Sequence, residues 1–500
     1  MRNEGLGSWP ARRARKTPER IAVEFGEDSL TYGQLHERVL RLAHSLRERG
    51  VRPGDRVAYL GPNHPALLET FFAAGTLGAV FVPLNTRLAG PELAAQLADA
   101  SVETLVYAPE QSSLAETLPT TGKIALDGDY PTLIATGATE PIDEPVTLDD
   151  PCMIMYTSGT TGQPKGAVLS HGNITWNSIN VLVDADLAGD EVTLVVAPLF
   201  HTAGLNMNCL PTLLKGGRVL LEPTFDPARV LRLVAERRVT LMFAVPAMYN
   251  TLAAHPGWAT TDLSSVRTLM CGGAPVPEST IRTYLARGLA FVQGYGMTEA
   301  SPGVLLLDRS QVLAKAGSAG VPHFFTQVRV ARPDDQADTA PGEKGEVLVS
   351  GPNVMRGYWN RPDETAAAFT PDGTWFRSGD IATSDEDGYV YLVDRLKDMI
   401  ISGGENIYPA EVENALSEHP AVQDCGVFGV PDPKWGEVGR AAVVLRPGRD
   451  TTPQDLRDFL LTRIAKYKVP ASFNFVEELP RNAVGKVLKS RLRDSYSKTP

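Results

Sequence analysis

The sequence predicts an α/β protein, with a large N-terminal domain of βα layers and parallel sheets, a small antiparallel β part, and a small α+β C-terminal domain. Three observations lead to this prediction. The chain has 500 residues, more than one hydrophobic core usually serves. Roughly the first 390 residues alternate short apolar, β-rich runs with amphipathic stretches. A different pattern begins near Asp394.

The N-terminal domain is predicted from alternating helical and extended periods. Ser29–Arg49 is predicted to be helical after its first turn, because apolar residues recur there at helical spacing, namely Leu35, Val39, Leu42 and Leu46. Val57–Leu60 follows as a short buried strand, and the apolar stretch Glu69–Ala79 leads into the glycine-punctuated run Gly78–Pro83. Such β–α alternation favours parallel sheets with helices on their faces.

The antiparallel part and the C-terminal domain have a different pattern. Val328–Val349 alternates strands with turns and indicates an antiparallel patch. The rest of the chain is predicted to hold two helices and two strands, at Pro409–His419, Val422–Val430, Ala441–Leu445 and Pro453–Ala465. We therefore expect domains at 1–394 and 395–500.

Composition excludes several classes of protein. Lys and Arg total 48 against 59 Asp and Glu, a net charge of -11, and an acidic surface repels nucleic acids. The four cysteines lie far apart and indicate a reducing compartment, so we expect a cytoplasmic protein. No stretch is long and apolar enough to span a membrane. Arg12, Arg13 and Arg15 indicate a solvated charged helix, with a weak peripheral membrane contact as the alternative.

The segment Tyr156–Gly166 is the most informative of the sequence. It follows a predicted strand, Met153–Met155, and is rich in glycine, serine and threonine, with one lysine. Backbone N–H groups of such a loop can surround phosphate oxygens, while hydroxyl groups and a lysine add donors and charge. A flexible surface loop is the simpler alternative. We predict a phosphate-binding loop formed by Thr157, Ser158, Gly159, Thr160, Thr161, Gly162 and Lys165.

A second segment, Gly294–Glu299, combines groups that suit a nucleotide and its metal. Its glycines permit close approach, Tyr295 offers an aromatic face, and Glu299 offers the hard oxygen ligand that Mg²⁺ prefers. Further segments follow in order along the chain, at Pro198–Leu205, Cys271–Pro275, Trp375–Asp380, Asp394–Asp398, Ser402–Pro409 and Pro480–Lys486.

Together these segments resemble the adenylate-forming superfamily, which comprises acyl-CoA synthetases, peptide adenylation domains and beetle luciferases. The resemblance extends from Leu30 to Lys486 and is greatest to the fatty-acyl and aryl CoA ligases. It implies ATP, Mg²⁺ and coenzyme A as cofactors. It also implies a mobile C-terminal domain.

The resemblance implies a role for each matched residue. Lys486, Thr298, Glu299 and His201 would be catalytic, and Thr157 and Glu299 would hold the metal. The nucleotide and CoA would be bound by the phosphate-binding loop together with Gly272, Gly273, Ala274, Gln293, Gly294, Tyr295, Gly296, Asp380, Arg395, Lys397, Gly403 and Gly404. Within this set Asp380 and Arg395 would contact the ribose or phosphates, Lys397 would be the hinge, and Gly403 and Gly404 would border the pantetheine passage.

The implied reaction joins a carboxylic acid to AMP with release of pyrophosphate, and then transfers the acyl group to the CoA thiol. Lys486 would face the charge that develops on the phosphate. By the same resemblance an amino acid is disfavoured, because His201–Ala203 holds no carboxylate to pair with its ammonium. The candidate acyl lining, which is Leu205, Met207, Val292 and Met297, is uncharged, which argues against malonate and favours an acid with an uncharged tail. A medium- or long-chain fatty acid is our first choice, and an aromatic acid such as a cinnamate is the second. His201 would gate that pocket or be a packed core histidine.

Other functions of the same sequence stay open at this point. A carrier-protein arm is the alternative acceptor to CoA, and a luciferase-like oxygenase and a non-catalytic sensor are further alternatives. The expected partners are a small carboxylic acid, ATP and CoA, in a monomer or a homodimer.

Overall fold

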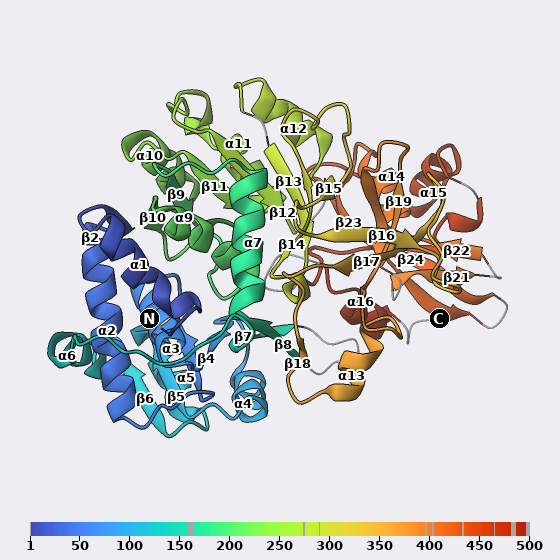
Figure 1. Cartoon of the computed structure of the whole chain (residues 1–500). Coiled ribbons are helices and arrows are strands. Elements are labelled where there is room, and N and C mark those ends of the chain that lie inside the picture. Colours follow the sequence, from blue (N-terminus) through green and yellow to red (C-terminus); the bar gives the residue numbers. More distant parts are fainter. Residues whose placement is uncertain are drawn as a thin grey trace. The chain divides into compact units, whose positions relative to one another are not determined.

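The computed structural model describes residues 2–157, 164–273, 276–289, 291–395, 398–402, 405–432, 435–464, 466–481 and 487–496. The chain forms two compact units (Figure 1). Unit 1 comprises Met1–Val328 and Val349–Phe376, and unit 2 comprises Arg329–Leu348 and Arg377–Pro500. The antiparallel patch thus contributes to the same unit as the C-terminal elements. The expected domain boundary at residue 394 stays a prediction.

The first sheet of unit 1 has seven strands in the order β18-β8-β7-β4-β3-β5-β6. They are β3 (Arg56–Leu60), β4 (Val80–Leu84), β5 (Thr104–Tyr107), β6 (Gly122–Ala125), β7 (Pro151–Thr157), β8 (Lys165–Ser170) and β18 (Gly357–Tyr358). Strands β7, β4, β3, β5 and β6 pair in parallel, whereas β8 pairs antiparallel with β7 and with β18. The predicted parallel sheet is therefore confirmed.

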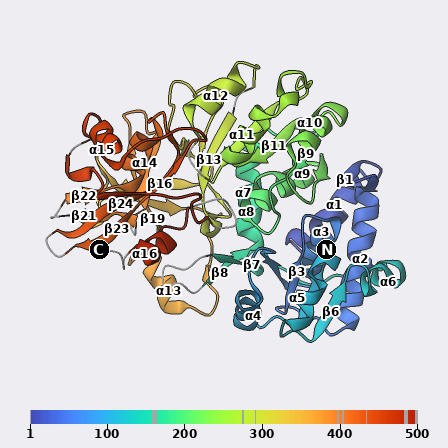
Figure 2. The ribbon, with the colours of Figure 1, turned by 180° about the vertical axis from the view of Figure 1, so that it is seen from behind.

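Helices cover both faces of this sheet because alternate strand residues point to opposite sides. Val57 and Tyr59 pack in the core that α2 and α3 share, and Ala58 and Leu60 pack in the core of α4 and α5. The helices are α2 (Tyr32–Glu48), α3 (Pro65–Thr76), α4 (Gly90–Asp99), α5 (Ser112–Thr117) and α6 (Asp129–Thr136). The rear view shows α4 and α5 beside β3 and β6 (Figure 2). Helix α2 fulfils the prediction for residues 29–49.

The second sheet of unit 1 has nine strands in the order β15-β14-β13-β12-β11-β9-β10-β1-β2. They are β1 (Ile21–Phe25), β2 (Asp28–Thr31), β9 (Val192–Val195), β10 (Arg218–Leu221), β11 (Leu241–Ala244), β12 (Thr268–Gly272), β13 (Phe291–Gly296), β14 (Gly303–Leu307) and β15 (Val321–Pro322). Its centre is parallel, and β13, β14 and β15 pair antiparallel at one edge.

Helix α7 (His171–Asp184) connects the two sheets of unit 1, because it contacts β7 and β8 of the first and β14 of the second. It appears as the upright green helix of Figure 1. Its start is fixed by reciprocal hydrogen bonds between Ser170 and Asn173, at 3.1 and 2.8 Å. The other helices of unit 1 are α1 (Trp9–Lys16), α8 (Thr202–Gly204), the π-helix η3 (Leu205–Cys209), α9 (Leu210–Lys215), α10 (Pro227–Glu236), α11 (Pro246–Ala254), α12 (Glu278–Leu285) and α13 (Pro362–Ala367), together with the short 3₁₀ helices η1 (Leu6–Ser8), η2 (Pro109–Gln111), η4 (Pro256–Ala259) and η5 (Thr298–Ala300).

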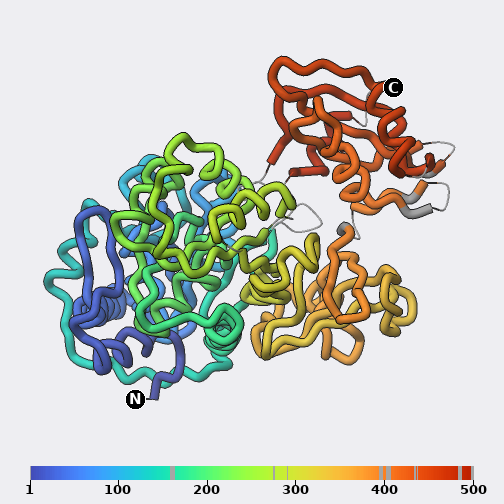
Figure 3. Tube along the Cα trace, turned by 90° about the horizontal axis from the view of Figure 1, so that it is seen from above, coloured from blue at the N-terminus to red at the C-terminus, as the bar shows by residue number. Residues whose placement is uncertain are grey.

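Unit 2 contains a four-stranded sheet, β16-β17-β19-β20, and a five-stranded sheet, β22-β21-β24-β23 with β25 beside β24. The yellow and orange tubes of Figure 3 show the first of these, built from segments far apart in sequence. Its strands are β16 (Gln327–Ala331), β17 (Gly345–Ser350), β19 (Phe376–Ser384) and β20 (Val390–Arg395). Strands β16 and β17 lie where the antiparallel patch was predicted, at residues 328–349, and in the same sheet β19 and β20 pair antiparallel.

The C-terminal elements of unit 2 follow the predicted order. They are β21 (Ile400–Ser402), β22 (Glu405–Ile407), α14 (Pro409–Ser417), β23 (Val422–Asp432), β24 (Gly436–Leu445), α15 (Pro453–Leu461), η7 (Lys466–Lys468), β25 (Ser472–Phe475) and α16 (Lys489–Tyr496). Helices α14 and α15 share one core with the sheet, and α16 packs on its other face. The predicted fold class is confirmed.

The helices of unit 1 and unit 2 that lie within the described ranges include none with the length and apolar content needed to cross a membrane.

Candidate active site

The two ends of the predicted phosphate-binding loop lie side by side on adjacent strands. Thr157 ends β7 and Lys165 begins β8, and the two residues are paired across the antiparallel ladder. The hydroxyl of Thr157 lies 3.5 Å from the carbonyl oxygen of Lys165. The predicted loop residues Ser158, Gly159, Thr160, Thr161 and Gly162 lie outside the described residues.

Glu299 is brought to this loop from the far sheet of unit 1, because the short helix η5 follows directly after β13. Thr157 Oγ1 lies 3.5 Å from Glu299 Oε1, and the hydroxyl of Tyr358 donates a hydrogen bond to the same oxygen at 3.0 Å. Oε2 makes no hydrogen bond with any described residue. Among the described residues, the carboxylate is thus held through Oε1.

Lys165 lies in the same cluster and already has an anionic partner. Its ammonium is 2.7 Å from Glu364 Oε2 and 5.2 Å from the centroid of the Tyr358 ring. The side chain of Lys165 is 16% exposed, so the ammonium is partly withdrawn from water. An ion pair of this kind can exchange for a phosphate oxygen, since both are anions of similar hydrogen-bonding capacity.

Tyr358 is a site residue that sequence reasoning missed. Strand β18 pairs with β8, which places Tyr358 opposite Ala167, and Trp359 donates its backbone N–H to Gly166 at 2.7 Å. Burial, followed by the charge of Glu299, raises the pKa of Tyr358 above its usual range, so the hydroxyl stays protonated and can donate. Gly357, with a φ of 150°, was the available sequence signal, since such a conformation favours glycine.

Buried asparagines fix the turn that carries Glu299. Asn353 donates to the carbonyl oxygens of Ala300 and Gly303 at 2.9 and 2.7 Å. Asn206 donates to the carbonyl of Ser301 at 3.1 Å, and Asn177 accepts from the backbone N–H of Gly303 at 2.9 Å. Asn177, Asn206 and Asn353 are each 0% exposed. Because buried polar groups cost free energy unless paired, this network restricts the turn to one conformation.

The predicted adenine-side residues lie on β12 and β13. Gly272 is paired with Gly294, and a Cβ on Gly272 would lie 2.8 Å from the Gly294 carbonyl oxygen. Gly273 has a φ of 83°, which favours glycine. Gln293, Tyr295, Gly296 and Thr298 follow in order on β13 and η5. Ala274 lies outside the described residues.

His201 is the half-buried residue that precedes α8. Burial lowers its pKa to about 4, so the imidazole is neutral at pH 7. Its Nε2 atom has no hydrogen-bond partner among the described residues, and its ring lies 4.7 Å from that of Phe200. The candidate acyl residues Leu205 and Met297 pack in one hydrophobic cluster, whereas Met207 packs in another with Phe243 and Met270. Val292 is 4% exposed.

The remaining predicted residues belong to unit 2. Asp380 is 6% exposed on β19, and its backbone pairs with that of Arg395 on β20. The preceding turn is held by Glu346, which accepts from the backbone N–H of Gly379 at 3.1 Å and pairs with Arg377 at 2.8 Å. Lys397, Gly403, Gly404 and Lys486 lie outside the described residues.

Thr157 and Glu299 fit a magnesium ion held mainly by a nucleotide. Together they offer a hydroxyl and a carboxylate oxygen, both hard ligands, and Mg²⁺ usually takes only one or two protein groups in addition to phosphates and water. The described residues hold no group of three His, Cys, Asp or Glu side chains suited to a metal. The donor set therefore fits a nucleotide-bound cation better than a resident one.

The AMP-binding enzyme family matches residues 10–359, and the AMP-binding enzyme C-terminal domain matches residues 411–486. Among curated relatives, a feruloyl-CoA synthase of an Amycolatopsis species is 59% identical over 99% of this chain and 100% of that protein. An indoleacetate–CoA ligase of Aromatoleum aromaticum is 42% identical over 98% and 97%. A long-chain-fatty-acid–CoA ligase of Mycobacterium tuberculosis is 40% identical over 100% and 99%.

Solved structures are also similar to nearly the whole of this chain. ATP-bound MatB from Rhodopseudomonas palustris has a TM-score of 0.91 at 32% identity, covering 98% of this chain and 99% of that one. The o-succinylbenzoate CoA synthetase of Bacillus subtilis, in complex with ATP and magnesium, has a TM-score of 0.88 at 34% identity, covering 97% and 99%.

The chain belongs to the AMP-binding enzyme family, in the acyl-CoA synthetase branch of the adenylate-forming superfamily. The enzyme class predicted from the sequence, an AMP-forming acid–CoA ligase, is confirmed.

Proposed function

We propose that this ligase activates a hydroxycinnamic acid, such as ferulate, and transfers it to coenzyme A. The observation that carries the proposal is the 59% identity to a feruloyl-CoA synthase over nearly the whole of both chains. The indoleacetate–CoA ligase also takes its name from an aromatic acid, and it precedes the fatty-acid ligase in identity, at 42% against 40%.

This assignment reverses the order of the two substrates predicted from the sequence. The predicted lining, which is Leu205, Met207, Val292 and Met297, is uncharged and would accommodate an aromatic ring as well as an alkyl chain. The polarity of these side chains therefore disfavours acids that carry a second charge on their tail. It does not distinguish an aromatic tail from an alkyl tail. The relatives favour the aromatic acid, and the fatty acid of medium or long chain is replaced as first choice.

In the proposed first step, ATP is bound with its phosphates against the 157–165 loop. Thr157 and Glu299 would hold Mg²⁺, which would supply positive charge against the phosphates. Tyr358 positions the Glu299 carboxylate through its 3.0 Å hydrogen bond, and Lys165 leaves Glu364 for a phosphate oxygen. Thr298 contacts the α-phosphate, Tyr295 stacks on adenine beside Gly272 and Gly294, and Asp380 and Arg395 contact the ribose and phosphates.

The chemistry needs no nucleophile from the protein. A carboxylate oxygen of the acid bonds to the α-phosphorus while the bond from that phosphorus to the bridging oxygen breaks, and pyrophosphate leaves. The ammonium of Lys486 stabilises the negative charge that builds on the α-phosphate oxygens. The CoA sulfur then bonds to the acyl carbon while the bond from that carbon to the AMP oxygen breaks, and AMP leaves. The thiol proton is lost to solvent. Lys397, Gly403 and Gly404 act in this second step.

The direct test is pyrophosphate release from ATP with a panel of acids, with and without CoA. Ferulate, cinnamate, indoleacetate, a long-chain fatty acid and malonate span the alternatives. We expect kcat/KM for ferulate to exceed that for the fatty acid by about tenfold or more. AMP release should require CoA, and a holo-carrier protein should not replace it. If the fatty acid gave the highest kcat/KM, the proposed substrate would be wrong. If no acid caused pyrophosphate release, the proposed reaction would be wrong.

A further inference from the structure

Lys165 of the proposed phosphate-binding loop is paired with an acid that has no other part in the proposed reaction. Glu364, in the first turn of α13, lies 2.7 Å from the Lys165 ammonium through its Oε2 atom. That oxygen makes no hydrogen bond with any described residue, so the contact is an ion pair without hydrogen-bond geometry. A phosphate oxygen in line with an N–H bond of the ammonium makes a stronger, charge-assisted contact.

Arg361 offers Glu364 a second cation. Arg361 Nε lies 3.8 Å from Glu364 Oε1, the other oxygen of the same carboxylate. The two side chains are 32% and 37% exposed, so neither is locked by packing. A carboxylate that loses Lys165 therefore keeps a cation within reach, and the cost of leaving a half-buried charge unpaired is avoided.

Arg361 itself is held by the end of α4. Its Nη2 donates to Asp99 Oδ1 at 2.7 Å, and the indole N–H of Trp359 donates to the Asp99 carbonyl oxygen at 3.1 Å. Trp359 is in turn fixed next to Lys165 along the chain, because its backbone N–H donates to the Gly166 carbonyl oxygen at 2.7 Å. Arg361 therefore stays close to Glu364 whichever group Lys165 contacts.

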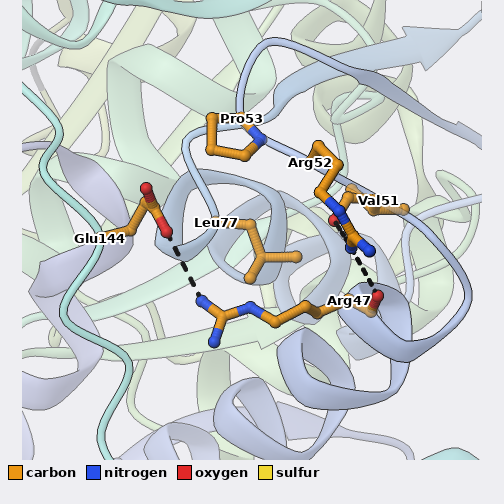
Figure 4. A pocket seen from close by; sticks show the side chains of 6 residues that line it. All are labelled: Arg47, Val51, Arg52, Pro53, Leu77 and Glu144. Atoms are coloured by element: carbon orange, nitrogen blue, oxygen red, sulfur yellow. Dashed lines mark hydrogen bonds and ion pairs between the residues drawn. The ribbon is translucent and has the colours of Figure 1, made fainter.

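Another ion pair of unit 1 lacks such a connection to the proposed site. Arg47 and Glu144 line a pocket of about 180 Å³ (Figure 4), and their charged groups lie 3.7 Å apart. Arg52 also lines this pocket and donates to the carbonyl oxygens of Arg47 and Val51 at 2.8 and 3.1 Å. Among the described residues, none that is predicted to bind the nucleotide lines it. Exchange of the Arg47–Glu144 pair for a phosphate therefore has no support.

We propose that Glu364 is a positioning residue that competes with phosphate for Lys165, and so lowers the affinity for ATP and for the leaving pyrophosphate. Lys165 exchanges Glu364 for a phosphate oxygen when ATP binds, and Glu364 then pairs with Arg361. When pyrophosphate leaves, Lys165 returns to Glu364, and the re-formed pair offsets part of the contact that is lost. Product release is thereby eased. This inference rests on the proposed function, because it requires that the loop holds ATP.

The test is the binding of Mg·ATP and of Mg·pyrophosphate, each measured by isothermal titration calorimetry of the full chain without any acid. Glu364→Gln removes the competing charge and keeps the shape of the side chain, so both ligands should bind about two- to fivefold more tightly. Loss of a merely structural contact would leave both affinities unchanged or weaken them. Asp363→Asn is the matched control, since Asp363 is the exposed neighbouring acid of the same helix turn; it should bind both ligands as the wild type does.

A second background separates exchange on Lys165 from a general effect of charge. In a Lys165→Gln protein, adding Glu364→Gln should change neither dissociation constant, because the cation that exchanges is absent. Equal affinities in the wild type and Glu364→Gln would overturn the proposal, as would the same tightening in the Lys165→Gln background. A wild type that binds neither ligand would refute the proposed function as well, whereas a wild type that binds both, with Glu364→Gln unchanged, would refute this inference alone.

Discussion

At the scale of single residues, the hydroxyl of Tyr358 makes the hydrogen bond that positions the Glu299 carboxylate. It donates to Glu299 Oε1 at 3.0 Å, and we expect Tyr358→Phe to leave that carboxylate free to rotate away from Thr157. Adenylation should slow by about tenfold, and KM for Mg·ATP should rise, because one hydrogen bond to a charged group contributes roughly 1.5–3 kcal/mol. ATP–pyrophosphate exchange measured against Mg·ATP concentration checks this.

Tyr156→Phe is the control for that variant. The hydroxyl of Tyr156 donates to Asp99 at 2.8 Å and to the Gln96 carbonyl at 3.0 Å, and it makes no contact with Glu299. The control should lose stability without a change in KM for Mg·ATP. Equal changes of KM in both variants would contradict the positioning role of Tyr358.

A second residue-scale prediction concerns His171 and pH. Burial lowers the pKa of His171 from 6.5 to about 4, and its Nδ1 accepts from the Leu6 backbone N–H at 3.1 Å. Below pH 6.5 the unfolded chain therefore binds a proton that the folded chain does not. His171 should thus destabilise unit 1 by about 2 kcal/mol between pH 7 and pH 5.

His171→Asn isolates this contribution, because the amide oxygen can replace Nδ1 as the acceptor. Denaturant unfolding at pH 7 and pH 5 measures it. The variant should lose less stability than the wild type as the pH falls. An identical loss in both proteins would mean that the imidazole is charged in the folded state.

At the scale of elements, two asparagines with the same chemistry are expected to affect different substrates. Asn353 makes three hydrogen bonds around the Glu299 turn, to Ala300, Gly303 and Thr326. Asn63 also makes three, to Ala197, Leu199 and Glu222, beside the segment that leads to His201. Alanine at either position should cost about 2–3 kcal/mol of stability, since buried partners are left unpaired.

The kinetic effects of the two variants should differ. Asn353→Ala should raise KM for ATP, and Asn63→Ala should raise KM for the acid, each with little effect on the other constant. Unfolding free energies and steady-state kinetics measure the two effects. A rise of both constants in both variants would mean that the asparagines act through general loosening and not through their own turns.

The same scale shows what the sequence could predict. Helix α2 and strand β3 were predicted because their periods are local properties, as were α14 and α15. The order of strands in the two large sheets was not predicted, because it depends on contacts between distant segments. Tyr358 was missed for the same reason: its partner Glu299 lies far away in sequence, and the preceding Gly357 is the only local signal at that position. The phosphate-binding loop itself lies mostly outside the described residues, so its contacts stay predictions.

At the scale of the whole molecule, Lys486 is proposed to act in adenylation and not in the transfer to CoA. Lys486→Ala should nearly abolish acid-dependent ATP–pyrophosphate exchange, because the charge that develops during adenylation loses its partner. Transfer from preformed acyl-AMP to CoA should be spared, since the lysine has no part in it. Measuring both rates on the same preparation tests this, and Lys489→Ala, a nearby lysine paired with Glu413 at 3.0 Å, is the control. Equal loss of both rates would contradict the division.

The Lys165–Glu364 ion pair has a consequence for how the nucleotide approaches. While that pair is formed, this lysine adds little attraction for an incoming polyanion, and the chain as a whole carries a charge of -11. Free ATP would meet long-range repulsion, which magnesium reduces by accompanying the phosphates. Uncomplexed ATP should therefore associate faster as ionic strength rises, whereas the magnesium complex should respond weakly to salt.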